Sequence, residues 1–72
     1  MDEVLEALRI VGDRRTEAMV MFNMSVVLMR MARVNDAVES QRRAVVLGEQ
    51  TEHPDLNQMR AFLAQLQEMA EG

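Results

Sequence analysis

Apolar residues along this 72-residue chain recur three and four positions apart, the spacing that places them on one face of an α-helix. Gly12, Gly48 and Pro54 interrupt the pattern, because glycine and proline disfavour a helix interior. With a further short link at Arg33–Asn35, these interruptions predict four helices, at Glu3–Val11, Arg14–Ala32, Asp36–Glu49 and Asp55–Ala70. Gly12 is expected to end the first helix, while Asp13 and Asn35 are expected to cap the next two.

The links between these helices are short, so neighbouring helices are expected to pack antiparallel as hairpins. Strong helix formers dominate the composition, and β-branched residues form no long alternating run. The expected fold class is therefore all-α, with about four helices in one domain. Because the chain contains no cysteine, helix packing and self-association are left to stabilise so small a domain.

The segment from Met19 to Met31, MVMFNMSVVLMRM, is apolar on more than one side of its predicted helix. One stripe is predicted to form the core and consists of Met21, Met24, Leu28 and Met31. A second stripe, on a different side, consists of Met19, Phe22, Val26 and Met29. A helix that is apolar on most sides must be covered on most sides, so the second stripe needs a partner.

Three interpretations are open for this methionine-rich helix. Methionine fills irregular gaps in cores, and methionine-rich surfaces also suit adaptable binding of amphipathic helices. Thioethers also bind copper(I), but methionines spread around a helix do not converge on one metal ion. We therefore expect a core face together with an apolar binding strip, and neither a metal nor a cofactor.

Charge and aromatic content restrict the partners. The chain has a net charge of -4, and Phe22 and Phe62 are its only residues of the Phe, Tyr or Trp types. A nucleic-acid surface needs a basic stripe or stacking aromatics, so no nucleic-acid partner is expected. The acidic start, MDEVLEAL, differs from a basic signal peptide, and the apolar runs are too short to span a bilayer. The expected localisation is cytoplasmic, with no membrane partner.

Candidate catalytic chemistry is sparse. There is no cysteine nucleophile and no glycine-rich phosphate loop, and Ser25 and Ser40 lie inside predicted helices. His53 lies beside Pro54 in a polar stretch with several nearby carboxylates. A lone histidine with flexible carboxylates is a weak ligand set, so a turn that caps the last helix is preferred over a metal site. No enzymatic activity is expected.

The spacing of these residues resembles the tetratricopeptide repeat, a two-helix unit with the pattern W-x2-L-G-x2-Y, then A-x3-F, then P. Met21–Leu28 carries the spacing of the first block, Ala37–Gln41 that of the second, and Pro54 stands near the repeat end. About one repeat length downstream, Leu56–Leu63 has the first-block spacing again. The segment Gly12–Ala18 is similar to the joints between repeats in the kinesin-light-chain-like bacterial members of this family.

Several positions depart from the family pattern. Ser25 replaces a glycine but is still small enough for close helix packing, whereas Gln41 places a polar group where the family has an aromatic residue. The link Ala32–Ala37 resembles the turn before the second helix, for which many members have G-x-x-x-E-A. We expect an altered or more hydrated contact around Gln41. The large first-block residues of the family are replaced by Met21, Met24 and Leu28.

The resemblance implies a fragment of a right-handed solenoid, with a half repeat at 1–12, a full repeat at 14–52 and a closing helix at 55–70. In this family the first helix of each repeat lines a concave groove that holds peptides. The residues that would face this groove are Met19, Phe22, Asn23, Val26, Met29 and Arg30. Phe22 and Val26 stand at two of the positions where carboxylate-clamp members have lysine and asparagine, so no such clamp is expected.

The expected function is that of a protein–protein interaction module, which binds a partner helix or peptide, or a second copy of itself, through the apolar strip. A homodimer is the simplest way to cover the strip, because open repeat ends expose faces that normally stack on neighbours. One alternative is a structural oligomerisation or capping element of a larger repeat array. Another is a small helical regulator that masks a partner's surface.

Overall fold

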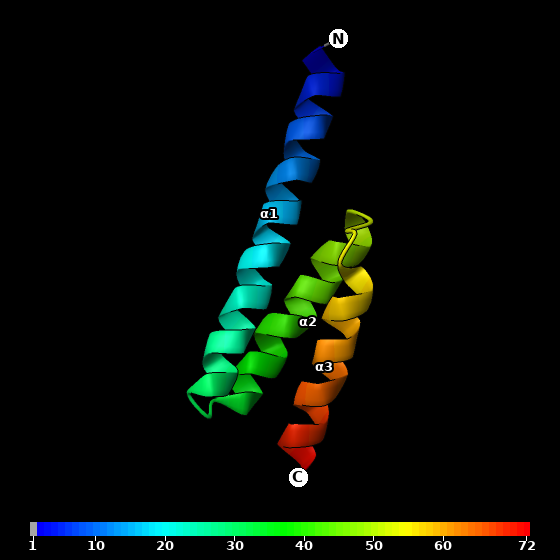
Figure 1. Cartoon of the computed structure of the whole chain (residues 1–72). Coiled ribbons are helices and arrows are strands. Elements are labelled where there is room, and N and C mark those ends of the chain that lie inside the picture. Colours follow the sequence, from blue (N-terminus) through cyan, green and yellow to red (C-terminus); the bar gives the residue numbers. More distant parts are fainter. Residues whose placement is uncertain (1) are drawn as a thin grey trace.

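The structure, a computed structural model, describes residues 2–72 as three α-helices without a strand. Helix α1 spans Asp2–Arg30, α2 spans Val34–Gln50 and α3 spans Leu56–Glu71 (Figure 1). Each turn reverses the chain, so α2 runs antiparallel to α1 and α3 runs antiparallel to α2. The all-α fold class is confirmed.

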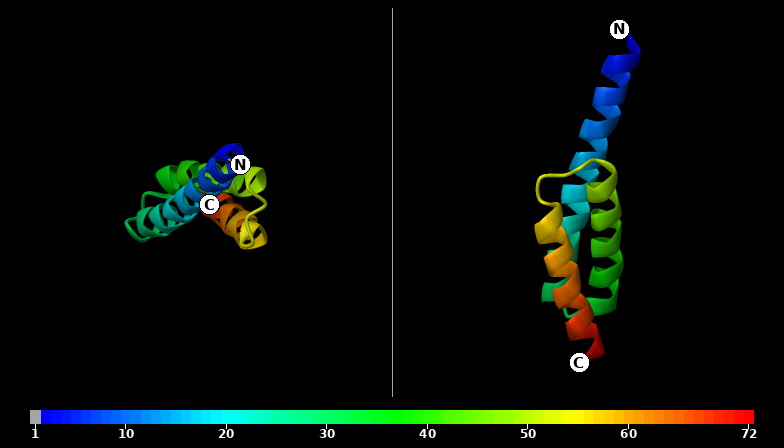
Figure 2. Two further views of the ribbon diagram at one scale, coloured as in Figure 1. Left: turned by 90° about the horizontal axis from the view of Figure 1, so that it is seen from above. Right: turned by 90° about the vertical axis from the view of Figure 1, so that its right-hand side faces the viewer.

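Helix α1 is much longer than the two helices that pack beside it. The molecule measures 51 × 19 × 13 Å, and α2 makes the main contacts with both other helices. The N-terminal half of α1 projects past the turn between α2 and α3, as both side views show (Figures 1 and 2). All of residues 2–16 are exposed. We call Asp2–Asp13 the N-terminal arm.

The first two predicted helices are one continuous helix, which corrects the expected number from four to three within residues 2–72. Gly12 does not end a helix, because its φ is not positive and the helical backbone runs through it. A glycine inside a helix costs only about 1 kcal/mol relative to alanine, and the strong helix formers around it offset that cost. Asp13 is consequently a helix-interior residue rather than an N-cap.

The turn between α1 and α2 is a Schellman motif, in which two backbone hydrogen bonds close the end of a helix. Ala32 has a φ of 63°, and its N–H donates to the Met29 carbonyl at 3.0 Å. The Arg33 N–H donates to the Leu28 carbonyl at 2.9 Å. Because α2 begins directly afterwards at Val34, Asn35 lies inside the helix and the predicted Asn35 cap is wrong.

The turn between α2 and α3 repeats this geometry. Glu52 has a φ of 50°, and the His53 N–H donates to the Gly48 carbonyl at 2.8 Å. Pro54 follows, and α3 begins at Leu56 with Asp55 as the preceding residue. The predicted ranges of the last two helices therefore lie within two residues of the observed ends.

Small residues allow the helices to approach closely. Ala18 on α1 and Ala37 and Ala44 on α2 have no exposed surface. Large apolar side chains from α3 fill the remaining space, and Met59 and Leu66 are fully buried. The core consists of one cluster around Met59, next to the turn between α2 and α3, and a second around Leu66.

Candidate interaction surface

The stripe predicted as the core face of α1 divides into buried and exposed members. Met21 and Leu28 pack against the two core clusters. Met24 and Met31 are 47% and 58% exposed, so their assignment to the core is wrong. The reason is that α2 approaches α1 on the side of Ala18 and Ser25, where small residues permit close contact. Met24 and Met31 lie away from that side.

The predicted groove residues also lie in different environments. Met19, Phe22 and Met29 are half-buried and pack against the core clusters, and Val26 is half-buried as well. Asn23 and Arg30 are exposed. Much of the second apolar stripe is thus covered by this chain's own α2 and α3.

A pair of stacked aromatic rings joins α1 to α3. The centroids of the Phe22 and Phe62 rings lie 5.5 Å apart, and their planes differ by 3°. Such offset stacking contributes about 0.5–1.5 kcal/mol beyond the burial of the rings. The pair therefore fixes the position of α3 against α1, beside the surface that remains open.

Next to this aromatic pair, an open apolar hollow of about 520 Å³ lies on the surface beside α1 and α3. Met29 comes from α1, and the remaining lining residues are Phe62, Gln65, Glu68 and Met69 on α3. Met69 is 49% exposed at the rim. Met29 is the predicted groove residue that reaches this hollow. The contribution of α3 was missed, although Phe62 and Met69 lie seven residues apart, which places them on one side of that helix.

A second apolar surface lies on the outer side of α1, away from α2 and α3. Its residues follow one another four, three and four positions apart, so they form one straight stripe. All of them are 47–58% exposed: Val20, Met24, Val27 and Met31. We call this set the outer stripe.

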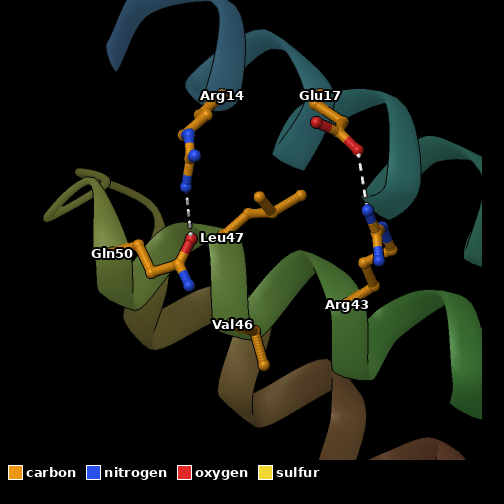
Figure 3. A pocket seen from close by; sticks show the side chains of 6 residues that line it. All are labelled: Arg14, Glu17, Arg43, Val46, Leu47 and Gln50. Atoms are coloured by element: carbon orange, nitrogen blue, oxygen red, sulfur yellow. Dashed lines mark hydrogen bonds and ion pairs between the residues drawn. The ribbon is translucent and has the colours of Figure 1, made fainter. Parts of the chain in front are cut away.

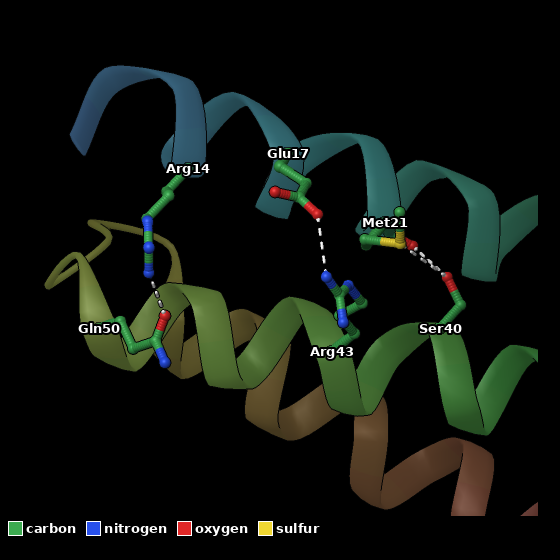
Figure 4. A network of polar contacts seen from close by, with 6 residues as sticks. All are labelled: Arg14, Glu17, Met21, Ser40, Arg43 and Gln50. Atoms are coloured by element: carbon green, nitrogen blue, oxygen red, sulfur yellow. Dashed lines mark hydrogen bonds and ion pairs between the residues drawn. The ribbon is translucent and has the colours of Figure 1, made fainter. Parts of the chain in front are cut away.

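The seam between α1 and α2 carries a polar hollow of about 330 Å³, lined by two arginines, a glutamate and a glutamine besides apolar residues (Figure 3). Arg14 donates to the Gln50 amide oxygen at 3.0 Å, and the Arg43 guanidinium lies 3.4 Å from a Glu17 carboxylate oxygen. Further along the seam, Ser40 donates to the Met21 carbonyl at 2.8 Å (Figure 4). These groups bond to one another across the seam, so the hollow serves helix pairing.

Gln41, the polar residue for which an altered contact is expected, is fully buried. Its amide nitrogen donates to the Met59 carbonyl on α3 at 2.9 Å. Its amide oxygen accepts from the Ser25 hydroxyl on α1 at 2.7 Å. Gln41 therefore connects all three helices. The expected altered contact is a hydrogen-bonded bridge between protein groups.

His53 takes part in the turn before α3. Only 8% of its surface is exposed, and its Nδ1 accepts a hydrogen bond from the Asp55 N–H at 3.1 Å. Within the described part of the chain, no group of three or more His, Cys, Asp or Glu side chains is arranged to hold a metal ion. The imidazole thus acts as an acceptor that fixes the turn geometry.

Comparison with protein-family models, curated proteins and solved structures gave no match for this chain. None of the helices in residues 2–72 combines the length and apolar character that a membrane span requires.

Proposed function

We propose that this chain is a protein–protein interaction module of tetratricopeptide type, which binds an amphipathic helix or peptide in the hollow between α1 and α3. The observation that carries the proposal is the hollow itself. It combines the side chains of Met29, Phe62 and Met69 in a space of about 520 Å³. Methionine side chains are flexible and polarisable, so a methionine-lined hollow suits binding of apolar side chains of differing shape.

The packing of the two-helix unit supports the family part of the proposal. The positions that the repeat pattern assigns to small residues, Ser25, Ala37 and Ala44, have no exposed surface. Ala32, at the position where many members have glycine, adopts a left-handed φ of 63°. Both features are what a repeat-like helix hairpin requires.

The rim of the hollow indicates the chemistry of the ligand. Glu68 and Gln65 stand beside the apolar lining, and the chain has a net charge of -4. The ligand that matches is a helix with two or three apolar side chains on one face and a lysine or arginine beside them. The apolar side chains would fill the apolar lining, and the basic residue would lie near Glu68.

A selection of helical peptides from a displayed library tests this function. Enriched peptides should bind the unaltered chain and lose about tenfold or more in affinity for Met69→Glu, because a charge at the rim opposes burial of apolar side chains. Met24→Glu is the matched control, since Met24 is 47% exposed and Met69 is 49% exposed. Its binding should be unchanged. Failure to enrich any peptide would contradict the proposal.

The outer stripe favours a second candidate function, a capping or oligomerisation element of a larger repeat array. Val20, Met24, Val27 and Met31 form a face that a neighbouring repeat would cover in a solenoid. The same selection separates the two functions. Ligands that tolerate Met69→Glu and lose affinity for Met24→Glu would place recognition on the outer stripe.

A further inference from the structure

The buried face of α1 continues into the exposed N-terminal arm. Residues of this face alternate at spacings of four and three, the heptad pattern of a helix seam. In order along α1 they are Val4, Leu8, Val11, Arg15, Ala18, Phe22, Ser25 and Met29. The second half of this face, from Ala18 onwards, packs against α2 and α3. The first half carries the same pattern without a covering helix, and Leu8 is 64% exposed.

The hydrogen bonds from α1 to α2 end at Arg14 and Arg15, and Arg15 reaches the last carbonyl. Its guanidinium donates to the Thr51 carbonyl at the end of α2, from Nη2 at 2.8 Å and from Nε at 3.2 Å. Beyond this level the arm extends for about three turns of helix. Val4, Leu5 and Leu8 are each more than 60% exposed there, with values of 62%, 66% and 64%.

We propose that a second copy of this chain covers the arm, with the two arms paired antiparallel about a two-fold axis. The distribution of charge selects this orientation. Residues 2–6 at the tip carry three acidic groups and no basic one, whereas residues 9–17 carry three arginines besides Asp13 and Glu17. An antiparallel pair places residues 2–6 of one copy level with residues 13–17 of the other, where Arg14 and Arg15 balance Asp13 and Glu17. A parallel pair would instead place the two acidic tips together. The tip residues are Asp2, Glu3 and Glu6, and the basic residues are Arg9, Arg14 and Arg15.

The heptad pattern also gives a register for the pair. The seam has two heptad positions, called a and d. In an antiparallel pair, an a residue of one helix packs beside a d residue of the other. Leu8 then faces Val11 of the second copy, and Val4 faces the aliphatic part of Arg15. Leu5 lies near Gly12 of the second copy, on the same side of the helix. A Cβ atom built at Gly12 meets nothing within 4 Å, so this side is open to a neighbouring chain.

A second copy suits this surface because the contact is self-complementary. The same residues meet on both sides of the two-fold axis, so the association closes at two chains and leaves no unpaired arm. The surface is separate from the hollow between α1 and α3. Self-association through the arms therefore goes beyond the proposed peptide binding and leaves the hollow of each copy accessible.

Sedimentation equilibrium of the 72-residue chain over micromolar to millimolar concentrations tests the proposal. A monomer–dimer equilibrium is expected, and Leu8→Gln should weaken it by about tenfold or more, since Leu8 lies in the paired seam of both copies. Ile10→Gln is the control, because Ile10 is an exposed apolar arm residue off the seam, and it should alter the equilibrium by less than about twofold. Far-ultraviolet circular dichroism of both variants checks that helicity is retained.

Spin labels at single introduced cysteines test the orientation, because the chain has no cysteine of its own. In the antiparallel register the two Asp13→Cys labels lie about 10 Å apart along the helix axis and the two Glu3→Cys labels about 20 Å apart. Parallel arms would give the same separation at both positions. Equal separations would overturn the proposal.

Two other results would also overturn it. One is a chain that stays monomeric up to millimolar concentration, and the other is a dimer that weakens equally in Leu8→Gln and Ile10→Gln. If Met24→Glu weakened the dimer and Leu8→Gln left its dissociation constant unchanged, the contact would lie on the outer stripe instead. None of these measurements involves Met69, so failure of the arm contact and failure of peptide binding can be told apart.

Discussion

The Ser25 hydroxyl lies 2.7 Å from the amide oxygen of Gln41, and this contact joins α1 to a polar bridge that crosses the whole molecule. The other end of the bridge is the hydrogen bond from the Gln41 amide nitrogen to the Met59 carbonyl. Ser25 Oγ is also 2.6 Å from the Phe22 carbonyl, so the single hydroxyl proton lies between two acceptors. In the described residues every buried side-chain nitrogen and oxygen atom has a partner.

Gln41→Ala should destabilise the fold by about 2–4 kcal/mol, because it removes two buried hydrogen bonds and leaves a cavity. Gln41→Leu keeps most of the volume and should cost about 1–2 kcal/mol. Urea unfolding followed by circular dichroism measures both values. The combined change Ser25→Ala with Gln41→Leu should cost less than the sum of the single changes, since neither the Ser25 hydroxyl nor the Gln41 amide oxygen is then left without the other. Strict additivity would show that the two side chains are not coupled.

Gly12→Ala should stabilise the chain by about 0.5–1 kcal/mol, because alanine favours a helix interior and the added methyl group has free space. If Gly12 instead ended a helix in a left-handed conformation, the same change would destabilise the chain. Thermal unfolding at low protein concentration measures the sign.

Gly48→Ala is the matched control for that change, at a helical glycine with close neighbours. Its Cβ would lie 3.0 Å from the Met59 sulfur atom and 3.1 Å from Leu56 Cδ1. Met59 is fully buried and has little room to move. The substitution should therefore be neutral or destabilising by about 1 kcal/mol, in spite of the better helix propensity of alanine.

Ala32→Gly should stabilise the turn between α1 and α2. The left-handed conformation of Ala32 costs an L-residue about 1 kcal/mol, and glycine adopts it without that cost. After allowing for the greater freedom of glycine in the unfolded chain, a net gain of up to about 0.5 kcal/mol is expected. Ala64→Gly, at an exposed position inside α3, should instead lose about 1 kcal/mol. Equal losses at both positions would show that residue 32 is not left-handed in solution.

Arg15→Gln should cost about 1 kcal/mol, and the cost should shrink as salt is added. Helix α2 has no basic residue in its last turn, so Arg15 supplies the positive charge at the carbonyl end of that helix from the neighbouring α1. Arg9→Gln is the comparison, because its pair with Glu6 is exposed on both sides and should contribute little. Denaturant unfolding of both variants at low and high salt checks the difference.

The helices and most of their ends could be predicted because they depend on local chemistry. Apolar spacing gave α2 and α3, and Pro54 marked the start of the last helix. Gly12 alone does not determine whether the helix ends there. The free-energy cost of one glycine in a helix is small compared with the summed helix propensity of the residues around it. Neither left-handed turn position, Ala32 or Glu52, is a glycine, so composition gave no direct signal for their conformation.

The buried side of α1 was harder to predict because this helix is apolar on most sides. Apolar residues three and four positions apart occur both on the packed face of α1 and on the outer stripe. The spacing therefore does not show on which side α2 and α3 lie. Ala18 and Ser25, seven residues apart, were the available signal, since small residues mark the side of closest approach. The hollow beside Met69 depends on the placement of α3 against α1, which no pattern within α1 specifies.

The stacked rings of Phe22 and Phe62 have a practical consequence for optical measurements. The chain contains no tryptophan and no tyrosine, so these two phenylalanines are the source of its near-ultraviolet aromatic spectrum. Because they come from α1 and α3 and lie in contact, their circular dichroism reports whether α3 is docked, independently of helix content. The molecule thus carries its own label-free reporter of tertiary packing, positioned beside the hollow where a bound helix would alter the signal.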